Sequence, residues 1–160
     1  SGTSWSQQAK IQASDAAGGD YFGEYVAIGG NTLVVGAYRE GAGGTDAGAA
    51  YVFTRSGTTW SQQAKLVASD AAASDYFGVS VGIEGDTILV GAYGKNSGAG
   101  AAYVFTRSGT SWTQAKKLVV SGAQNYDNFG YRVVISNNTI LVGALGEDSY
   151  TGAAYTFIAG

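Results

Sequence analysis

The fold is decided by residues 75–120, which read DYFGVSVGIEGDTILVGAYGKNSGAGAAYVFTRSGTSWTQAKKLVV. Residues 76–83 alternate between apolar and small side chains, which predicts a strand, and a tight turn at 84–86 follows. The run at 87–93 is continuously apolar, as in a strand buried on both faces. Two more strands are expected at 101–107 and 112–120. In the last strand, alternate residues should share one face: Trp112, Gln114, Lys116, Leu118 and Val120. The pattern predicts an antiparallel meander of four strands whose loops are too short for helices.

The same pattern occurs three times in the chain. WSQQAK at 5–10 returns at 60–65, and DYFG at 20–23 returns at 75–78 and, as DNFG, at 127–130. A repeat of about 50 residues built from four short strands is typical of a propeller blade. We therefore expect an all-β fold, a β-propeller of four-stranded antiparallel blades. The alternatives are a flat β-solenoid and a sandwich of repeats.

Composition removes several classes of function. The 160 residues include no Cys, His, Met or Pro, and the net charge is −3. Without His or Cys there is neither an ordinary zinc site nor a Ser-His-Asp triad. Nucleic acid is not an expected partner, because phosphates require clustered Lys and Arg. No apolar run is long enough to span a membrane. Near-identical repeats without proline are typical of a recently duplicated, consensus-like or engineered sequence.

The chain does not begin and end at predicted blade boundaries: it begins with the outer strand of one blade and ends with a blade that lacks its outer strand. We expect one repeat domain over residues 1–160, made of an opening outer strand at 4–13, blades at 20–68 and 75–120, and an incomplete blade at 127–158. An uncovered strand edge is normally closed by another strand. Two chains that exchange opening strands would form a homodimer with a six-bladed ring. The expected assembly interface consists of Trp5, Ala9, Ile11, Ala154, Tyr155 and Phe157. A fragment of a longer array, a distorted monomer, another ring size and open-ended polymers are the alternatives.

Phe-Gly on one strand followed by Val-Gly-Ala on the next resembles the FG-GAP repeat of integrin α-subunit propellers. Bacterial FG-GAP-type repeats are more similar still, because they share the pattern QAKL, ASD, DYFG, GAY and GAAYVFTRSG. The likeness covers the whole chain, three times over. The resemblance implies that the Phe-Gly strand is innermost and the Trp-containing strand outermost. It also implies a natural location outside the cell or at the cell surface.

Many FG-GAP repeats carry a calcium loop between their first two strands. Here the connections are GGN (29–31), EGD (84–86) and SNN (136–138). A Ca²⁺ site needs about 6–8 oxygen ligands, which such turns do not supply. We therefore expect no metal and no cofactor. The repeated pairs Asp15/Asp20 and Asp70/Asp75 are interpreted as turn residues that accept backbone hydrogen bonds.

The outer hairpins also suggest a sialidase-like hydrolase as an alternative. The outer hairpins read TRSGTTW (54–60) and TRSGTSW (106–112), which resemble the Asp-box turn of propeller sialidases without its Asp. The chain has no cluster of Arg for a substrate carboxylate, and its acids recur as repeat-equivalent copies. We therefore expect no catalytic residue and a protein that is not an enzyme.

The two ends of the predicted blades differ in their loops. One end has minimal turns, and the other has long loops at 13–21, 38–49, 68–76, 93–101, 120–128 and 145–153. Loops on a rigid scaffold are where binding residues usually lie. The candidate ligand-binding residues are Tyr38, Arg39, Tyr93, Lys95, Glu147 and Tyr150. We predict a non-catalytic interaction module with a protein or glycan ligand; a glycan-binding lectin and a degenerate hydrolase are the alternatives.

Overall fold

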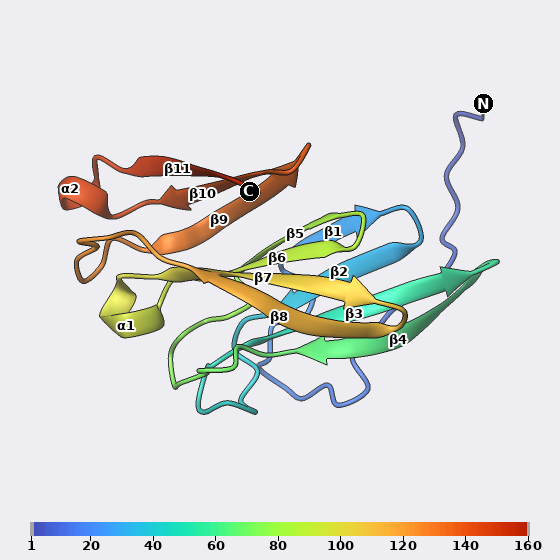
Figure 1. Cartoon of the computed structure of the whole chain (residues 1–160). Coiled ribbons are helices and arrows are strands. Elements are labelled where there is room, and N and C mark those ends of the chain that lie inside the picture. The colour runs from blue at the N-terminus through green and yellow to red at the C-terminus, as the bar shows by residue number, and fades with distance from the viewer. Residues whose placement is uncertain (1, 160) are drawn as a thin grey trace.

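The computed structural model describes residues 2–159 and consists of three antiparallel sheets side by side (Figure 1). Blade 1 contains β1 (Val26–Gly29), β2 (Thr32–Ala37), β3 (Ala49–Ser56) and β4 (Thr59–Leu66). Blade 2 contains β5 (Ser80–Glu84), β6 (Thr87–Ala92), β7 (Ala101–Ser108) and β8 (Ser111–Leu118). Blade 3 contains β9 (Phe129–Ser136), β10 (Thr139–Ala144) and β11 (Ala153–Ile158). Each strand pairs with the next along the chain, so the predicted all-β fold with three propeller-like blades is confirmed.

The first strand of each of the first two blades is shorter than the sequence predicts. Residues 76–83 were expected to be one regular strand, but β5 begins at Ser80. Tyr76 and Gly78 have positive φ angles of 55° and 92°, which interrupt an extended chain. Phe77, between them, forms a parallel bridge to Gly48 of blade 1. The Phe-Gly segment therefore joins neighbouring blades before it enters its own sheet.

A β-bulge divides each outer strand into two halves that face opposite ways. In β8, Gln114 pairs with Phe105 and Lys116 pairs with Val104, so Ala115 is the extra residue. Trp112 and Gln114 point toward blade 1, whereas Lys116 and Leu118 lie on the face toward blade 3. The expectation that all five alternate residues share one face is therefore wrong. β4 has the same bulge at Gln63.

The core lies between the blades. Val34 and Val52 of blade 1 pack with Phe77 and Ile88 of blade 2 in one apolar cluster. A second cluster joins blade 2 to blade 3 through residues that include Leu89 and Phe129. The middle strands β2 and β6 are almost wholly buried, as their continuous apolar runs predict. Stacking blades face to face is therefore what gives each sheet its buried surface.

Glycine allows the backbones of adjacent blades to touch. A Cβ built on Gly36 would overlap the carbonyl oxygen of Gly78, and one built on Gly91 would overlap that of Gly130. The glycines of the Phe-Gly steps make the same close approach, since a Cβ on Gly78 or Gly130 would overlap the carbonyl oxygen of Ala49 or Ala101 in the preceding blade.

The long loops gather at one end of the blades and the short turns at the other (Figure 1). Two long loops contain single helical turns, α1 (Lys95–Gly98) and α2 (Glu147–Tyr150), where no helix was expected. Asn96 and Ser97 of α1 are left-handed, as are Asp148 and Ser149 of α2, so these turns close tightly without extending into helices. Within residues 2–159, no helix is long and apolar enough to cross a membrane.

Candidate functional site

A row of aromatic rings crosses the three blades. Tyr21 lies 5.5 Å from Tyr38, and Tyr38 lies 6.1 Å from Tyr76, measured between ring centroids. Tyr76 and Tyr93 are stacked at 5.0 Å with an interplanar angle of 12°. Tyr131 of β9 continues the series, 5.5 Å from Tyr93. We call these five residues the tyrosine row.

The backbone that presents two of these rings is strained. Tyr21 and Tyr76 have φ angles of 56° and 55°, a conformation that costs a bulky side chain about 1–2 kcal/mol. The third repeat has Asn128 at the equivalent position with φ 57°, and Asn tolerates this region more easily. Repeats one and two therefore keep a tyrosine where a smaller residue is favoured. Strain of this kind is found at positions with a functional constraint.

A cation ends the row at blade 1. The guanidinium carbon of Arg39 lies 5.1 Å from the ring centroid of Tyr21 and 5.6 Å from that of Tyr38. Burial raises the pKa of Tyr93, and its neighbouring tyrosines add to the effect. A second guanidinium, that of Arg132, lies 4.8 Å from the ring centroid of Tyr131 at the other end of the row. The rings are tilted relative to one another except for the Tyr76–Tyr93 stack, so the row offers ring edges and faces with a cation at each end, suited to stacking and to hydrogen bonding.

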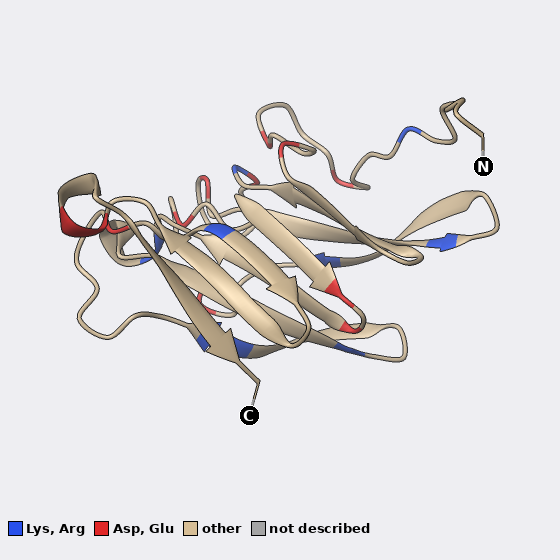
Figure 2. Cartoon of the chain, turned by 90° about the horizontal axis from the view of Figure 1, so that it is seen from above, with Lys and Arg blue, Asp and Glu red and all other residues tan. Residues whose placement is uncertain are grey.

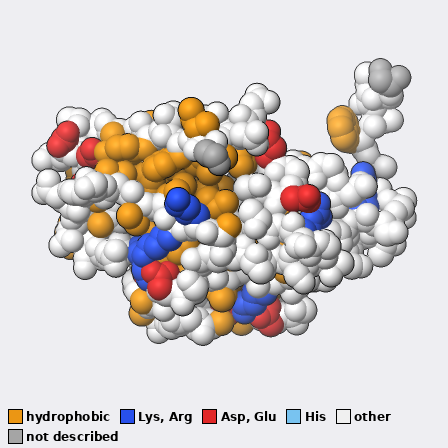
Figure 3. Space-filling model, viewed as in Figure 1, with side chains coloured by type: hydrophobic (Ala, Val, Ile, Leu, Met, Phe, Trp, Pro, Cys, Tyr) orange, Lys and Arg blue, Asp and Glu red, His pale blue; other side chains and the backbone are white. Residues whose placement is uncertain are grey.

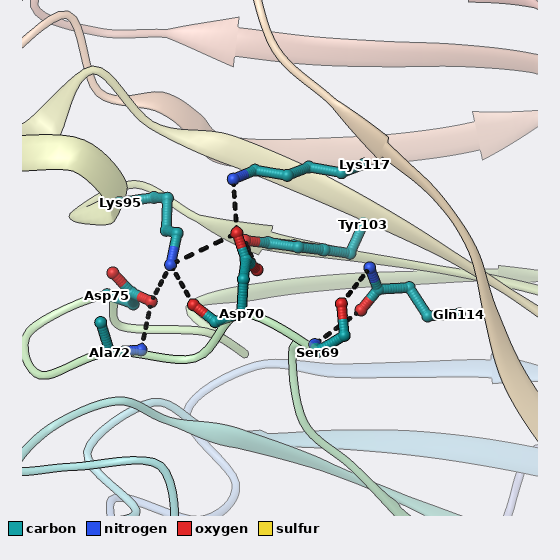
Figure 4. Close-up of polar contacts among 8 residues, drawn as sticks. All are labelled: Ser69, Asp70, Ala72, Asp75, Lys95, Tyr103, Gln114 and Lys117. Atoms are coloured by element: carbon teal, nitrogen blue, oxygen red, sulfur yellow. Dashed lines mark hydrogen bonds and ion pairs between the residues drawn. The ribbon is translucent and has the colours of Figure 1, made fainter.

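Lys95 belongs to a buried network instead of this surface. Its Nζ donates to Asp75 Oδ2 at 2.8 Å and to the carbonyl oxygen of Asp70 (Figure 4). The Lys95 side chain is only 7% exposed, and that of Asp75 only 5%. The structure therefore assigns Lys95 to holding the long loop of blade 2, and we leave it out of the candidate ligand surface.

Asp70 joins blade 1 to blade 2. It accepts hydrogen bonds from Lys117 Nζ at 2.6 Å and from the Tyr103 hydroxyl at 2.8 Å (Figure 4). Burial raises the pKa of Asp70, but the hydrogen bonds from Lys117 and Tyr103 outweigh it and lower the pKa to about 2. Asp70 is an ion-pair partner and not the turn residue expected from the sequence.

The second Asp of each loop does behave as expected. Asp20 accepts from the backbone N–H of Ala17, Asp75 from that of Ala72, and Asp127 from that of Gln124. Within residues 2–159, no group of three or more Asp, Glu, His or Cys side chains is arranged to hold a metal ion.

Glu147 and Tyr150 lie in α2 of blade 3, apart from the row. Glu147 accepts a hydrogen bond from the Tyr155 hydroxyl, and this bond, with some desolvation, raises the pKa of Tyr155 to about 12. Tyr150 is 70% exposed and lines a hollow of about 280 Å³ with Tyr126. Of the six candidate residues, the structure brings together Tyr38, Arg39 and Tyr93. No sequence signal marks Tyr131, because it has no aromatic equivalent in the other repeats.

In the opening segment (residues 4–15), the part from Gln8 onward lies against blade 1 in the place of an outer strand, but it does not form the strand expected at 4–13. Gln8 Oε1 accepts from Trp60 Nε1 at 3.2 Å, and Asp15 pairs with Lys65 at 2.6 Å. Ser14 N–H donates to Gln62 at 2.9 Å. At the junction of blades 1 and 2 the same contacts are Gln63 with Trp112, Asp70 with Lys117 and Ser69 with Gln114. The opening segment therefore has the position that β4 has relative to the next blade, although it pairs with no strand among the described residues.

At the other end of the structure, β11 pairs only with β10 among the described strands. Beside its open edge is a hollow of about 350 Å³, lined by Val104, Lys116, Leu118, Ile140, Phe157, Ile158 and Ala159. Figure 3 shows an apolar patch over this part of the molecule. In β11, Tyr155 and Phe157 are half-buried and Ala154 is exposed. Trp5 of the opening segment is 96% exposed.

Meanders of this kind, joined face to face by glycine contacts, define a β-propeller-like repeat protein. A family model described as the FG-GAP repeat matches residues 5–53, 60–105 and 112–157. The chain thus belongs to the FG-GAP repeat family, and the resemblance seen in the sequence is confirmed. No curated protein matches the chain.

Proposed function

We propose that the chain is a non-catalytic propeller scaffold that assembles with a second copy of itself by exchange of opening strands. The opening segment of each copy pairs with β11 of the other, and the two half-rings form a six-bladed homodimer. The assembled ring presents its long-loop face to a protein or glycan ligand. As a member of a family typically found outside the cell, it would act there or at the cell surface.

The observation that carries this proposal is the repeated set of contacts made by the opening segment. Gln8, Ser14 and Asp15 contact blade 1 as Gln63, Ser69 and Asp70 contact blade 2. At the junction of blades 1 and 2, these contacts come from β4, the outer strand of the preceding blade, and from the residues that follow it. The opening segment would therefore be the outer strand of a blade that precedes blade 1. The sheet that lacks an outer strand is blade 3, so the two features complement each other.

The apolar hollow beside β11 supports the same exchange. Trp112 of β8 packs in the cluster between blades 1 and 2 with Phe105, Val52 and Leu66. Phe157, Val104 and Leu118 are the equivalent residues beside β11, and they line the hollow of about 350 Å³. Trp5 of a second copy is the repeat equivalent of Trp112, and its indole fits this place.

Deletion of residues 1–12 tests the proposal. The mass in solution, measured by light scattering, is expected to be twice 16.3 kDa for the whole chain. The shortened chain should lose the dimer and aggregate, because its β11 edge stays open in every copy. A stable 16.3 kDa monomer for the whole chain contradicts strand exchange. A larger ring would correct the number of blades and keep the exchange.

Glycan binding is a second candidate because of the tyrosine row. The exposed ring of Tyr21, with Arg39 beside it, offers an apolar ring face to a sugar and a donor to its hydroxyls. A glycan array with the whole chain, and with Tyr21→Ala and Arg39→Ala, separates this role from binding of protein alone. Signals that do not depend on either residue would exclude the row as the glycan site.

A further inference from the structure

Two sheet faces are uncovered in the structure, one at each end of the stack of blades. The outer face of blade 3 is formed by Val134, Leu141, Gly143 and Ala154, which lie side by side in the sheet register. The free face of blade 1 is the part of that sheet that the opening segment does not cover. It is formed by Val26 and Ile28 of β1 and by Gly23 just before β1.

Both faces have buried equivalents inside the chain. Leu141 is 42% exposed, whereas Val34 and Leu89 at the same repeat position are fully buried by the next blade. Val26 is 67% exposed, whereas Val81 and Val133 are 8% and 5% exposed. The outer face of blade 3 and the free face of blade 1 thus correspond to the two faces that meet at each blade junction. The chain already forms this junction twice, between blades 1 and 2 and between blades 2 and 3.

Packing among the described residues does not require a glycine at position 143. A Cβ on Gly36 or Gly91 would overlap a carbonyl oxygen of the next blade, but one on Gly143 would meet only Arg132 of its own blade, at 3.8 Å. Its φ lies outside the left-handed region, so the backbone does not require glycine either. On blade 1, a Cβ on Gly23 would meet nothing within 4 Å, whereas those on Gly78 and Gly130 would overlap the preceding blade.

Each blade junction within the chain contains a backbone hydrogen bond from the Phe of the Phe-Gly step to the preceding blade. The Phe77 N–H donates to the Ala47 carbonyl at 2.9 Å, and the Phe129 N–H donates to that of Ala99 at 3.3 Å. By repeat position, the third member of this series would be a hydrogen bond from the Phe22 N–H to the Thr151 carbonyl. These two groups make no such bond within residues 2–159.

Charge also favours a copy of the same chain. Lys65 of β4 pairs with Glu40 of its own blade at 3.1 Å. By repeat position, Lys10 of the opening segment corresponds to Lys65, and Glu147 corresponds to Glu40. Lys10 forms no ion pair among the described residues, and α2 carries acidic residues at the end of blade 3 (Figure 2). Lys10 of a second copy, laid along β11, would reach Glu147.

We propose that the outer face of blade 3 is a docking surface for the free face of blade 1 of a second copy, with Gly143 against the partner's Phe-Gly step. The inference rests on the self-assembly proposed above and adds a second contact to it. Strand exchange joins the outer edges of the blades, whereas this surface joins their faces near the axis. The interface is head-to-tail, and two such contacts close the ring.

Gly143→Ala tests the surface directly. The added methyl group has room in the unassembled chain, so its unfolding midpoint at low protein concentration should not fall. In the assembly the methyl group meets the partner's backbone, and the dissociation constant measured by sedimentation velocity should rise about 10- to 100-fold. Gly91→Ala is the matched control, because the same change at the internal junction should destabilise folding itself.

A second variant keeps the test informative if Gly143→Ala folds poorly. Val134→Lys places a charge on the exposed outer face, where Val134 is 55% exposed, and should also weaken assembly tenfold or more. Assembly by the whole chain, lost on deletion of residues 1–12 but unchanged in both variants, would overturn the docking surface and leave strand exchange standing. A whole chain that stays monomeric would overturn both.

Discussion

Replacement of Trp112 by alanine is expected to destabilise the chain by about 3–5 kcal/mol. The indole is mostly buried between blades 1 and 2, and its Nε1 donates to Gln63 at 2.8 Å. A tryptophan side chain buries about 150–250 Å², which at about 25 cal/mol per Å² corresponds to roughly 4–6 kcal/mol if all of it is covered. Partial exposure reduces this value to about 3–4 kcal/mol, and the lost hydrogen bond adds about 1 kcal/mol.

Urea unfolding of the wild-type chain and the variant, followed by circular dichroism, measures the difference. Thr113→Ala is the matched control, since this neighbour in β8 is exposed and its replacement should change stability by about 0.5 kcal/mol or less. Trp60→Ala should resemble Trp112→Ala, because the opening segment covers Trp60. A loss below about 1 kcal/mol for Trp112→Ala would refute the role of the ring in joining blades and favour a ligand-stacking role.

Asp70→Asn should destabilise the chain at neutral pH, because the pKa of Asp70 is lowered to about 2 and its ionised form is stabilised by folding. That stabilisation is complete above the ordinary pKa of 3.8 and is lost as the pH falls through 2, so wild-type and variant urea curves should converge in acid. EDTA should leave the melting temperature unchanged; a fall that Ca²⁺ restores would reveal a missed site near Asp15 and Asp20. Ser97→Gly should stabilise by about 0.5 kcal/mol in thermal unfolding, since Ser97 has φ 58°.

The candidate binding surface was only partly predictable from sequence. Tyr38, Arg39 and Tyr93 follow a strand into long loops, which marks them as candidates, and the structure places all three in or beside the tyrosine row. Lys95 carries the same local signal but is buried against Asp75, because the left-handed residues Asn96 and Ser97 turn the loop inward. Local pattern does not report such a turn, since it depends on which loop packs beside it.

The sequence by itself determined the four-stranded repeat, because alternation, turn residues and continuous apolar runs are local properties that recur three times along the chain. Only the tertiary structure decided how one repeat meets the next. The bulge at Ala115 sends Leu118 to the face opposite Trp112, and the bridge from Phe77 to Gly48 joins two blades. The bridge depends on contact between two different repeats, and the bulge on how β8 pairs with β7, so neither is contained in the alternation of a single strand. The same packing explains why Gly36 and Gly91 are covered and Gly143 is open, a difference that identical neighbouring residues do not reveal.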